Sequence, residues 1–304
     1  MMFAVSRYGA RVLPNTEQIV AACKARGEFI EGPHIAQFEA AFARRLGLDP
    51  AQAIATSYGR MAFYNILQSL GLPPGSEIVV PALTFWVVPE LARAAGFRVV
   101  FADIDPATFN LDAAALERAI TPETRAVVPT HLYGLPCDMD AIMTIAECHN
   151  LRVVEDCAHS LGATFRGRPV GTFGDAAFFS FQTLKPLNCY GGGMAVVRDG
   201  ALAGRVRERT LADRWPDQKR VENRLLVGRL QRTFIRPPVF TVRSSAVRTK
   251  PPARMRSSSL DNPVLQPVQA CLVQAHQSRL SSATSLSSPV HAQPSGVCLS
   301  RPLK

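Results

Sequence analysis

Short apolar runs rich in β-branched residues alternate with longer helical segments between residues 53 and 199. The seven runs are AIAT (53–56), EIVVP (77–81), RVVFADI (98–104), AVVPTH (126–131), RVVEDC (152–157), DAAFFSF (175–181) and GMAVVRD (193–199). The segments between them repeat apolar residues at the three-to-four spacing of helices packed on one side, as in GRMAFYNILQSLG (59–71). Strands that are apolar on both faces and alternate with helices are typical of parallel sheets. The sequence therefore predicts a three-layer α/β/α fold around a mostly parallel, seven-stranded sheet.

The regular pattern stops near residue 236. The following residues are rich in Ser, Pro and Arg and keep no steady period of 2 or 3.6. We predict a large domain over residues 1–240 and a disordered segment over residues 241–304, which should be cut first by a protease. The change is abrupt enough to suggest that the reading frame or the gene was altered near residues 240–243, a hypothesis that sequencing the locus would test.

Charge is unevenly distributed along the chain. The formal net charge is +10, but nine of the 34 Lys and Arg residues and one of the 24 Asp and Glu residues lie after residue 235. The first 235 residues are therefore nearly neutral. The basic residues of the last segment stand among serines and prolines, with no aromatic residue after Phe240. This pattern favours a disordered basic segment over a folded nucleic-acid-binding surface, and we expect no nucleic-acid partner.

Hydropathy argues against a membrane-spanning protein, and the spacing of the cysteines argues against a zinc-binding one. No apolar run approaches the roughly 18 residues of a membrane span, and the first residues, MMFAVSRYGARVLPN, lack a signal-peptide pattern. We therefore expect a cytoplasmic protein with no membrane partner. The seven cysteines form no CxxC pair and no zinc-like spacing with a histidine. We expect reduced structural thiols and no metal site.

Polar residues stand where the predicted strands end, which is the edge at which sites collect in open parallel sheets. Lys185, in FFSFQTLKPLN (178–188), follows an apolar run. Burial disfavours an ammonium there, whereas a Schiff base with pyridoxal phosphate removes that charge. Asp156 ends a strand and suits the pyridine nitrogen of this cofactor, while Glu155 should point to the opposite side. SYGRMA (57–62), with Gly59, and Ser180 offer phosphate donors, and LTFW (83–86) offers an aromatic face.

Each of these residues has an ordinary structural interpretation when taken alone. Asp156 can cap a helix, Gly59 can belong to a turn, and Lys185 can be a solvated loop residue. Phe85 and Trp86 can be core aromatic residues, and His159 can be a satisfied surface or core histidine. Their order along the chain, each at the end of a different predicted strand, favours a shared cofactor site.

Long stretches of the chain resemble one known family. GEFIEGPHIAQFEAAFARRLG (27–47), GSEIVVPALTFWVVPELARAAGFRVVFADIDPATFNLD, AITPETRAVVPTHLYGLPCDMDAI and VVEDCAHSLGATFRGRPVGTFGDAAFFSFQTLKPLNCYGGGMAVV are similar to the DegT/DnrJ/EryC1/StrS sugar aminotransferases, which are fold type I pyridoxal-phosphate enzymes. The resemblance covers roughly residues 8–235. It implies a homodimer that transfers an amino group from an amino acid, glutamate, to a nucleotide-linked keto-sugar.

The resemblance also implies roles for seven residues. Lys185 would carry the cofactor and move a proton, Asp156 would hold the pyridine nitrogen, and His159 would lie near the ring hydroxyl. Phe85 would stack on the ring, and Ser180 with the Gly59 region would hold the phosphate. Arg60 departs from the threonine that is usual at its position, although a guanidinium also binds phosphate. No match to the family's small C-terminal domain is found after residue 240.

Three other functions compete with transamination. A branch of the family dehydrates sugars and has histidine in place of the lysine, so Lys185 favours transamination. A nicotinamide-dependent Rossmann enzyme would need GxGxxG after its first strand, and SYGRMAF does not supply it. The third alternative is a non-catalytic remnant or interaction protein that keeps the large-domain fold, which the missing C-terminal domain favours.

Overall fold

The computed structural model describes residues 15–28, 30, 32–182, 185–213 and 217–235. The elements are, in chain order, α1 (Thr16–Ala25), α2 (His34–Leu46), η1 (Pro50–Gln52), β1 (Ala53–Thr56), α3 (Gly59–Ser69), β2 (Glu77–Pro81), α4 (Val87–Ala94), β3 (Arg98–Ala102), α5 (Ala113–Ala119), β4 (Thr124–Val127), η2 (Leu132–Gly134), α6 (Met139–Cys148), β5 (Arg152–Asp156), β6 (Thr164–Phe165), β7 (Arg168–Pro169), β8 (Ala176–Ser180), β9 (Gly193–Val197), α7 (Gly200–Ala212) and α8 (Gln218–Ile235). The predicted segment 241–304 lies outside the described residues, and so does the expectation that it is disordered.

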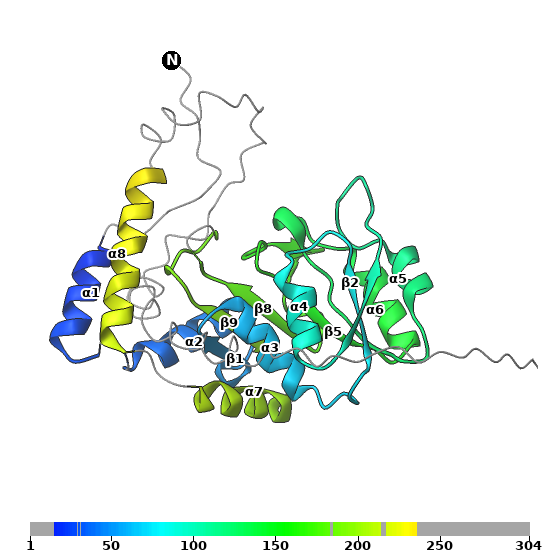
Figure 1. Cartoon of the computed structure of the whole chain (residues 1–304), viewed down its shortest axis with the longest axis horizontal. Helices are drawn as coiled ribbons and strands as arrows, with labels where there is room; N and C mark the ends of the chain where they lie inside the picture. Colours follow the sequence, from blue (N-terminus) through cyan, green and yellow to red (C-terminus); the bar gives the residue numbers. More distant parts are fainter. Residues whose placement is uncertain (1–14, 29, 31, 183–184, 214–216, 236–304) are drawn as a thin grey trace, which may run out of the picture.

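The seven predicted strands form one sheet in the order β1-β9-β8-β5-β4-β2-β3. β9 runs antiparallel to both of its neighbours, whereas the other adjacent pairs are parallel. β1 therefore runs in the same direction as β8, and six strands end at one edge of the sheet. The fold class predicted from the sequence is confirmed (Figure 1). A short antiparallel pair, β6 and β7, was not predicted.

Five of the seven predicted strands have different boundaries in the structure, and the largest difference is in β4. The run 126–131 was expected to be one strand, but β4 ends at Val127 and begins two residues earlier, at Thr124. Pro129 has no backbone N–H for a ladder, so the strand pattern breaks before it. β3 ends at Ala102, two residues before the predicted end. His131 therefore stands beyond its strand, where its side chain is buried.

Alternating residues of the strands pack against helices on both faces of the sheet. Ala53 of β1 and Phe179 of β8 pack with Phe38 and Phe42 of α2, and α8 contributes Val221 to the same cluster. On the other face, residues of β1, β8 and β9 pack with α3, α4 and α7. Because both faces are covered, the strands read as continuous apolar runs in the sequence.

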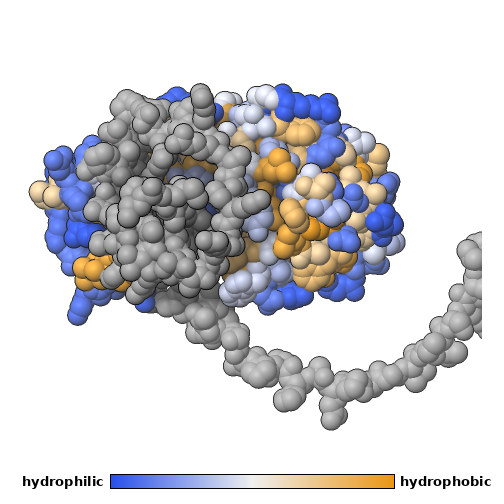
Figure 2. Space-filling view, turned by 90° about the horizontal axis from the view of Figure 1, so that it is seen from above, coloured by the Kyte–Doolittle hydropathy of each residue, from blue (hydrophilic) through white to orange (hydrophobic). Residues whose placement is uncertain are grey.

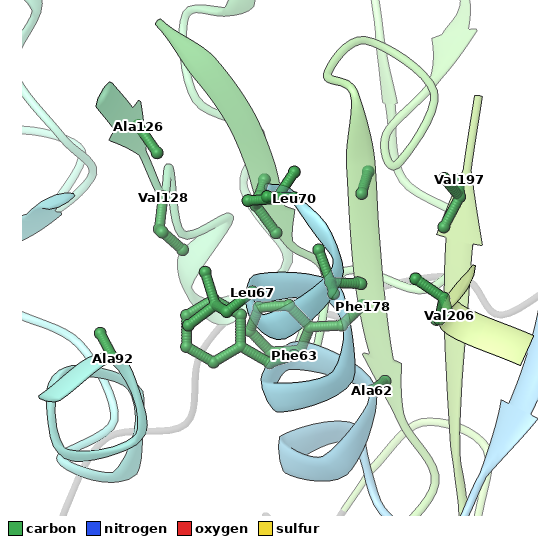
Figure 3. Packing of buried hydrophobic residues seen from close by; sticks show 14 of the residues in the cluster. Ala62, Phe63, Leu67, Leu70, Ala92, Ala126, Val128, Phe178, Val197 and Val206 are labelled. Atoms are coloured by element: carbon green, nitrogen blue, oxygen red, sulfur yellow. The ribbon is translucent and has the colours of Figure 1, made fainter. Parts of the chain in front are cut away.

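Helix α3 is the centre of the second cluster (Figure 3). The rings of Phe63 of α3 and Phe178 of β8 lie 4.8 Å apart between centroids, with Leu67 beside them. Phe63 has no exposed surface, and truncating such a side chain to alanine typically lowers stability by about 3–5 kcal/mol. This packing fixes the position of α3, whose first residue is Gly59.

Local sequence signals set several helix ends. Asp112, Asp138 and Asp199 precede α5, α6 and α7, and each side chain accepts a hydrogen bond from a backbone N–H in the first turn. Gly47 follows α2 in the left-handed conformation, with φ of 73°. Among the residues that the structure describes, no helix combines the length and apolar character needed to cross a membrane.

Candidate active site

The polar residues at the carboxyl ends of the strands meet at one edge of the sheet. Thr130, which follows β4, forms a parallel bridge with Asp156 at the end of β5. Asp156 in turn lies beside Phe178 of β8 in the sheet. Ser180 ends β8, and the N–H of Lys185 donates to the carbonyl oxygen of Gln182 over 2.9 Å. The strand order therefore brings together residues from three separate parts of the sequence.

Lys185 and Asp156 interact electrostatically within this edge. Burial lowers the pKa of the Lys185 amine, and the charge of Asp156 opposes that shift. Burial raises the pKa of Asp156, while the N–H of Ala158 and the charge of Lys185 oppose it. The Ala158 N–H donates to Oδ1 of Asp156 over 2.9 Å, which fixes the carboxyl group. Burial thus favours the neutral form of each group, and their mutual attraction favours the charged pair.

His159 lies in the same electrostatic environment. Burial and, to a smaller extent, the charge of Lys185 together lower its pKa to about 4, so the ring is neutral at pH 7. The ring of Tyr133 stacks on it, with 6.0 Å between centroids and an interplanar angle of 9°. Nδ1 of His159 is buried and has no hydrogen-bond partner among the described residues. A buried ring nitrogen without a partner is a position where a ligand can form a hydrogen bond.

Gly59 and Ser180 form a close backbone contact at the start of α3. A Cβ atom on Gly59 would lie 2.8 Å from the carbonyl oxygen of Phe179 and 2.9 Å from Cβ of Ser180. Only glycine fits there without displacing β8. The contact brings Ser180 next to the first residues of α3, where a helix has N–H groups without intrahelical acceptors. The start of a helix favours an anion, because the positive end of the helix dipole lies there.

Arg60, the second residue of α3, is half-buried. Its guanidinium stacks over the ring of Tyr58, 4.4 Å from the centroid. Burial lowers its pKa. The side chain therefore brings a partly desolvated cation to the end of α3 where an anion is favoured.

Phe85 lies on the loop between β2 and α4. Its neighbour Thr84 forms a hydrogen bond of 3.1 Å with Thr130 between their hydroxyl oxygens, which ties this loop to the edge that carries Asp156. The Phe85 side chain is 56% exposed and contacts the ring of Trp86 at 5.9 Å between centroids. Its ring is therefore available for a planar ligand, although no contact joins it to Lys185 or Asp156.

Comparison with known proteins identifies the family. Residues 13–226 match the model of the DegT/DnrJ/EryC1/StrS aminotransferase family. This chain belongs to the DegT/DnrJ/EryC1/StrS family. The resemblance inferred from the sequence is thereby confirmed.

Two curated relatives and one solved structure show what the chain is similar to. It is 45% identical over 176 residues to GDP-perosamine synthase of Caulobacter vibrioides, covering 58% of this chain and 47% of the relative. It is 42% identical over 158 residues to the UDP-N-acetyl-3-dehydro-alpha-D-glucosamine 3-aminotransferase of Acidithiobacillus ferrooxidans, covering 52% and 43% of the two chains. The crystal structure of the aminotransferase TlmJ from Streptoalloteichus hindustanus superposes with a TM-score of 0.65 at 34% identity, covering 68% of this chain and 56% of that one. The chain spans about half the length of the curated relatives it matches.

Two parts of this family member's site were not identified from the sequence. Tyr133 has a left-handed backbone with φ of 53° and is 72% exposed beside His159. Strained residues of this kind gather at functional sites. The HLYG stretch that contains Tyr133 was part of the family resemblance, but nothing in it indicated a stack with a residue that lies 26 positions later.

Glu155 supports the site from the opposite face of β5, as its alternation with Asp156 predicted. Its carboxylate accepts hydrogen bonds from the backbone N–H groups of Gly171, Phe173 and Gly174, at 2.7–2.8 Å. Nε2 of His131 lies 3.1 Å from the same carboxylate. Since the Cys137 N–H donates to Nδ1 of His131, that ring carries its proton on Nε2 and donates it to Glu155. This buried network holds the chain segment that leads into β8.

Proposed function

We propose that this chain binds pyridoxal phosphate and transfers an amino group from an amino acid, glutamate, to the keto group of a nucleotide-linked sugar. The observation that carries the proposal is the electrostatic coupling of Lys185 and Asp156 beside the Gly59–Ser180 contact. The names of two relatives support the sugar substrate, because one is a GDP-perosamine synthase and the other an aminotransferase for a UDP-linked dehydro-sugar.

The residues present fit this cofactor. A buried carboxylate suits a protonated ring nitrogen, and Asp156 is 4% exposed at the strand end. The unpartnered Nδ1 of His159 suits the ring hydroxyl. The start of α3 and Ser180 suit a phosphate group, because the close contact at Gly59 places Ser180 beside a helix N-terminus.

Each residue has a distinct chemical task in this proposal. Bound pyridoxal phosphate supplies an aldehyde that joins an amine and a ring that accepts electrons from the neighbouring carbon. Lys185 holds the cofactor through its amine and moves a proton with Nζ, for which a pKa lowered by burial is suited. Asp156 keeps its partner nitrogen protonated, because a neutral pyridine withdraws electrons less strongly. The His159 ring, which stacks on Tyr133, orients the cofactor ring from one side.

A homodimer is part of the proposal. Exposed large hydrophobic side chains on the loops near the site are Leu83, Phe85, Trp86, Phe109, Tyr133 and Leu135. Figure 2 shows hydrophobic residues gathered on one face of the molecule, beside the grey residues. Monomeric proteins rarely expose large contiguous apolar patches, whereas subunit interfaces bury them. A second copy of the chain would cover these side chains.

The proposal is tested by reduction of the cofactor complex. Protein incubated with pyridoxal phosphate should absorb visible light, and borohydride should attach the cofactor to the peptide that contains Lys185, as read by mass spectrometry. Lys185→Ala should lose the attachment, because no other amine replaces it at this position. Lys219→Ala, at an exposed position of α8, is the matched control and should keep it.

Turnover then separates the enzyme from the alternative of a non-catalytic remnant. Glutamate and a set of nucleotide-linked keto-sugars are supplied, and the amino-sugar product is measured. Attachment at Lys185 with product supports the proposed function. Attachment without product supports the remnant. A reduced adduct at a lysine other than Lys185 contradicts the assignment of the site.

A further inference from the structure

Two arginines from distant parts of the chain lie near each other at the start of α3. Arg60 belongs to α3, and Arg224 belongs to α8. Both are half-buried. The positive charge of Arg224 is close enough to lower the pKa of Arg60, in addition to the larger effect of burial. The two guanidinium groups therefore repel each other in a partly desolvated position.

Backbone contacts hold Arg224 in this place. Its Nε donates to the carbonyl oxygen of Tyr190 over 3.2 Å. Gly228, one turn later in α8, packs on the Tyr190 ring, and a Cβ atom there would lie 2.3 Å from a ring carbon. Two residues after Tyr190, the N–H of Gly192 donates to the carbonyl oxygen of Ser57 over 2.9 Å. Helix α8 is thus fixed against the loop that borders the start of α3.

The contact with Tyr58 links Arg60 to the same loop. Tyr58 forms a parallel bridge with Gly192, and its ring lies under the Arg60 guanidinium. Both arginines therefore contact the same pair of hydrogen-bonded segments, residues 57–60 and residues 190–193. The first of these segments also contains Gly59, which contacts Ser180.

No acidic side chain neutralises this pair within the described part of the chain. The ion pairs found there include other arginines, such as Arg207 with Glu39, but neither Arg60 nor Arg224. The hydroxyl of Ser57, which is 0% exposed, has no hydrogen-bond partner among the same residues. Paired cations, a buried donor and a helix start all favour a bound anion.

We propose that Arg224 of α8, together with Arg60 of α3, binds the phosphate group of the cofactor. The inference rests on the proposed function, because it takes pyridoxal phosphate as the ligand. A phosphate dianion accepts hydrogen bonds from both guanidinium groups and removes their repulsion. Helix α8 is then part of the cofactor site, although it follows the last strand of the sheet. Cofactor binding should consequently strengthen the contact of α8 with Tyr190.

Comparison of two ligands tests the role of Arg224. Pyridoxal phosphate and pyridoxal, which lacks the phosphate, are titrated against the full chain and followed by absorbance. In Arg224→Gln, which keeps a donor for the Tyr190 carbonyl, the dissociation constant of pyridoxal phosphate should rise about 10- to 100-fold. That of pyridoxal should change less than about twofold. Arg220→Ala, at an exposed position in the first turn of α8 and one turn before Arg224, is the matched control and should leave both constants unchanged.

The outcomes distinguish this inference from the proposed function. A selective loss of pyridoxal phosphate binding in Arg224→Gln, with an unchanged thermal unfolding midpoint without cofactor, supports the role of Arg224. Equal losses for both ligands, or no loss, overturn it while the proposed function stands. Wild-type protein that binds neither ligand overturns both. The phosphorus NMR signal of bound pyridoxal phosphate gives a second readout, since it should shift between wild type and Arg224→Lys.

Discussion

At the scale of single residues, the titration of His159 makes stability depend on pH. The unfolded chain protonates this histidine near pH 6.5, whereas the folded protein does so only near pH 4. The unfolded state therefore binds more protons between these values, and the free energy of unfolding falls as pH falls through this window. We expect a loss of up to roughly 3 kcal/mol between pH 7 and pH 4 from this group.

Denaturant unfolding of the cofactor-free protein at several pH values measures this effect. His159→Gln should remove the contribution and flatten the curve between pH 4 and pH 6.5. His149→Gln, at an exposed position, is the control and should keep the wild-type slope. If His159→Gln and wild type lose stability in parallel, the burial of the His159 ring does not govern this pH dependence.

At the scale of elements, the position of α3 depends on the close contact at Gly59. Gly59→Ala should destabilise the protein by about 1–3 kcal/mol and weaken pyridoxal phosphate binding, because the added methyl group collides with Phe179 and Ser180. Gly204→Ala in α7 meets no atom within 4 Å and should instead stabilise by about 0.5–1 kcal/mol, from helix propensity alone. Thermal unfolding and cofactor titration measure both. Equal behaviour of the two variants would show that the contact at Gly59 does not matter.

At the scale of the whole molecule, the exposed loops near the site predict association. Trp86 is 68% exposed and Leu135 is 47% exposed, which is unfavourable for apolar side chains in water. Trp86→Asp should shift the proposed dimer toward monomer in sedimentation experiments, because a charge at an interface loses its hydration. Leu226→Asp places the same charge at an exposed position of α8, and it is the control that should leave the dimer unchanged. A wild-type protein that stays monomeric at high concentration, yet binds cofactor, contradicts the proposed dimer.

The sequence alone predicted the seven strands, the layer architecture and the residues at the strand ends. This was possible because each signal is local. Because successive side chains of a strand point to opposite faces of the sheet, Asp156 and Glu155 of β5 face opposite sides. The spacing of apolar residues predicts α3 and α6. The family resemblance added the expected roles of Lys185 and its neighbours. Strand boundaries were less accurate, since Pro129 and the ladder contacts decide where β4 ends.

Only the tertiary structure decided how these pieces meet. The antiparallel direction of β9, the stack of Tyr133 on His159 and the approach of Arg224 to Arg60 depend on contacts between residues far apart in the chain. A local pattern sets which face of an element is apolar, but not which distant element covers that face. Arg224 is one of many arginines in the sequence, and it acquires a distinct environment only because Gly228 lets α8 pack on Tyr190.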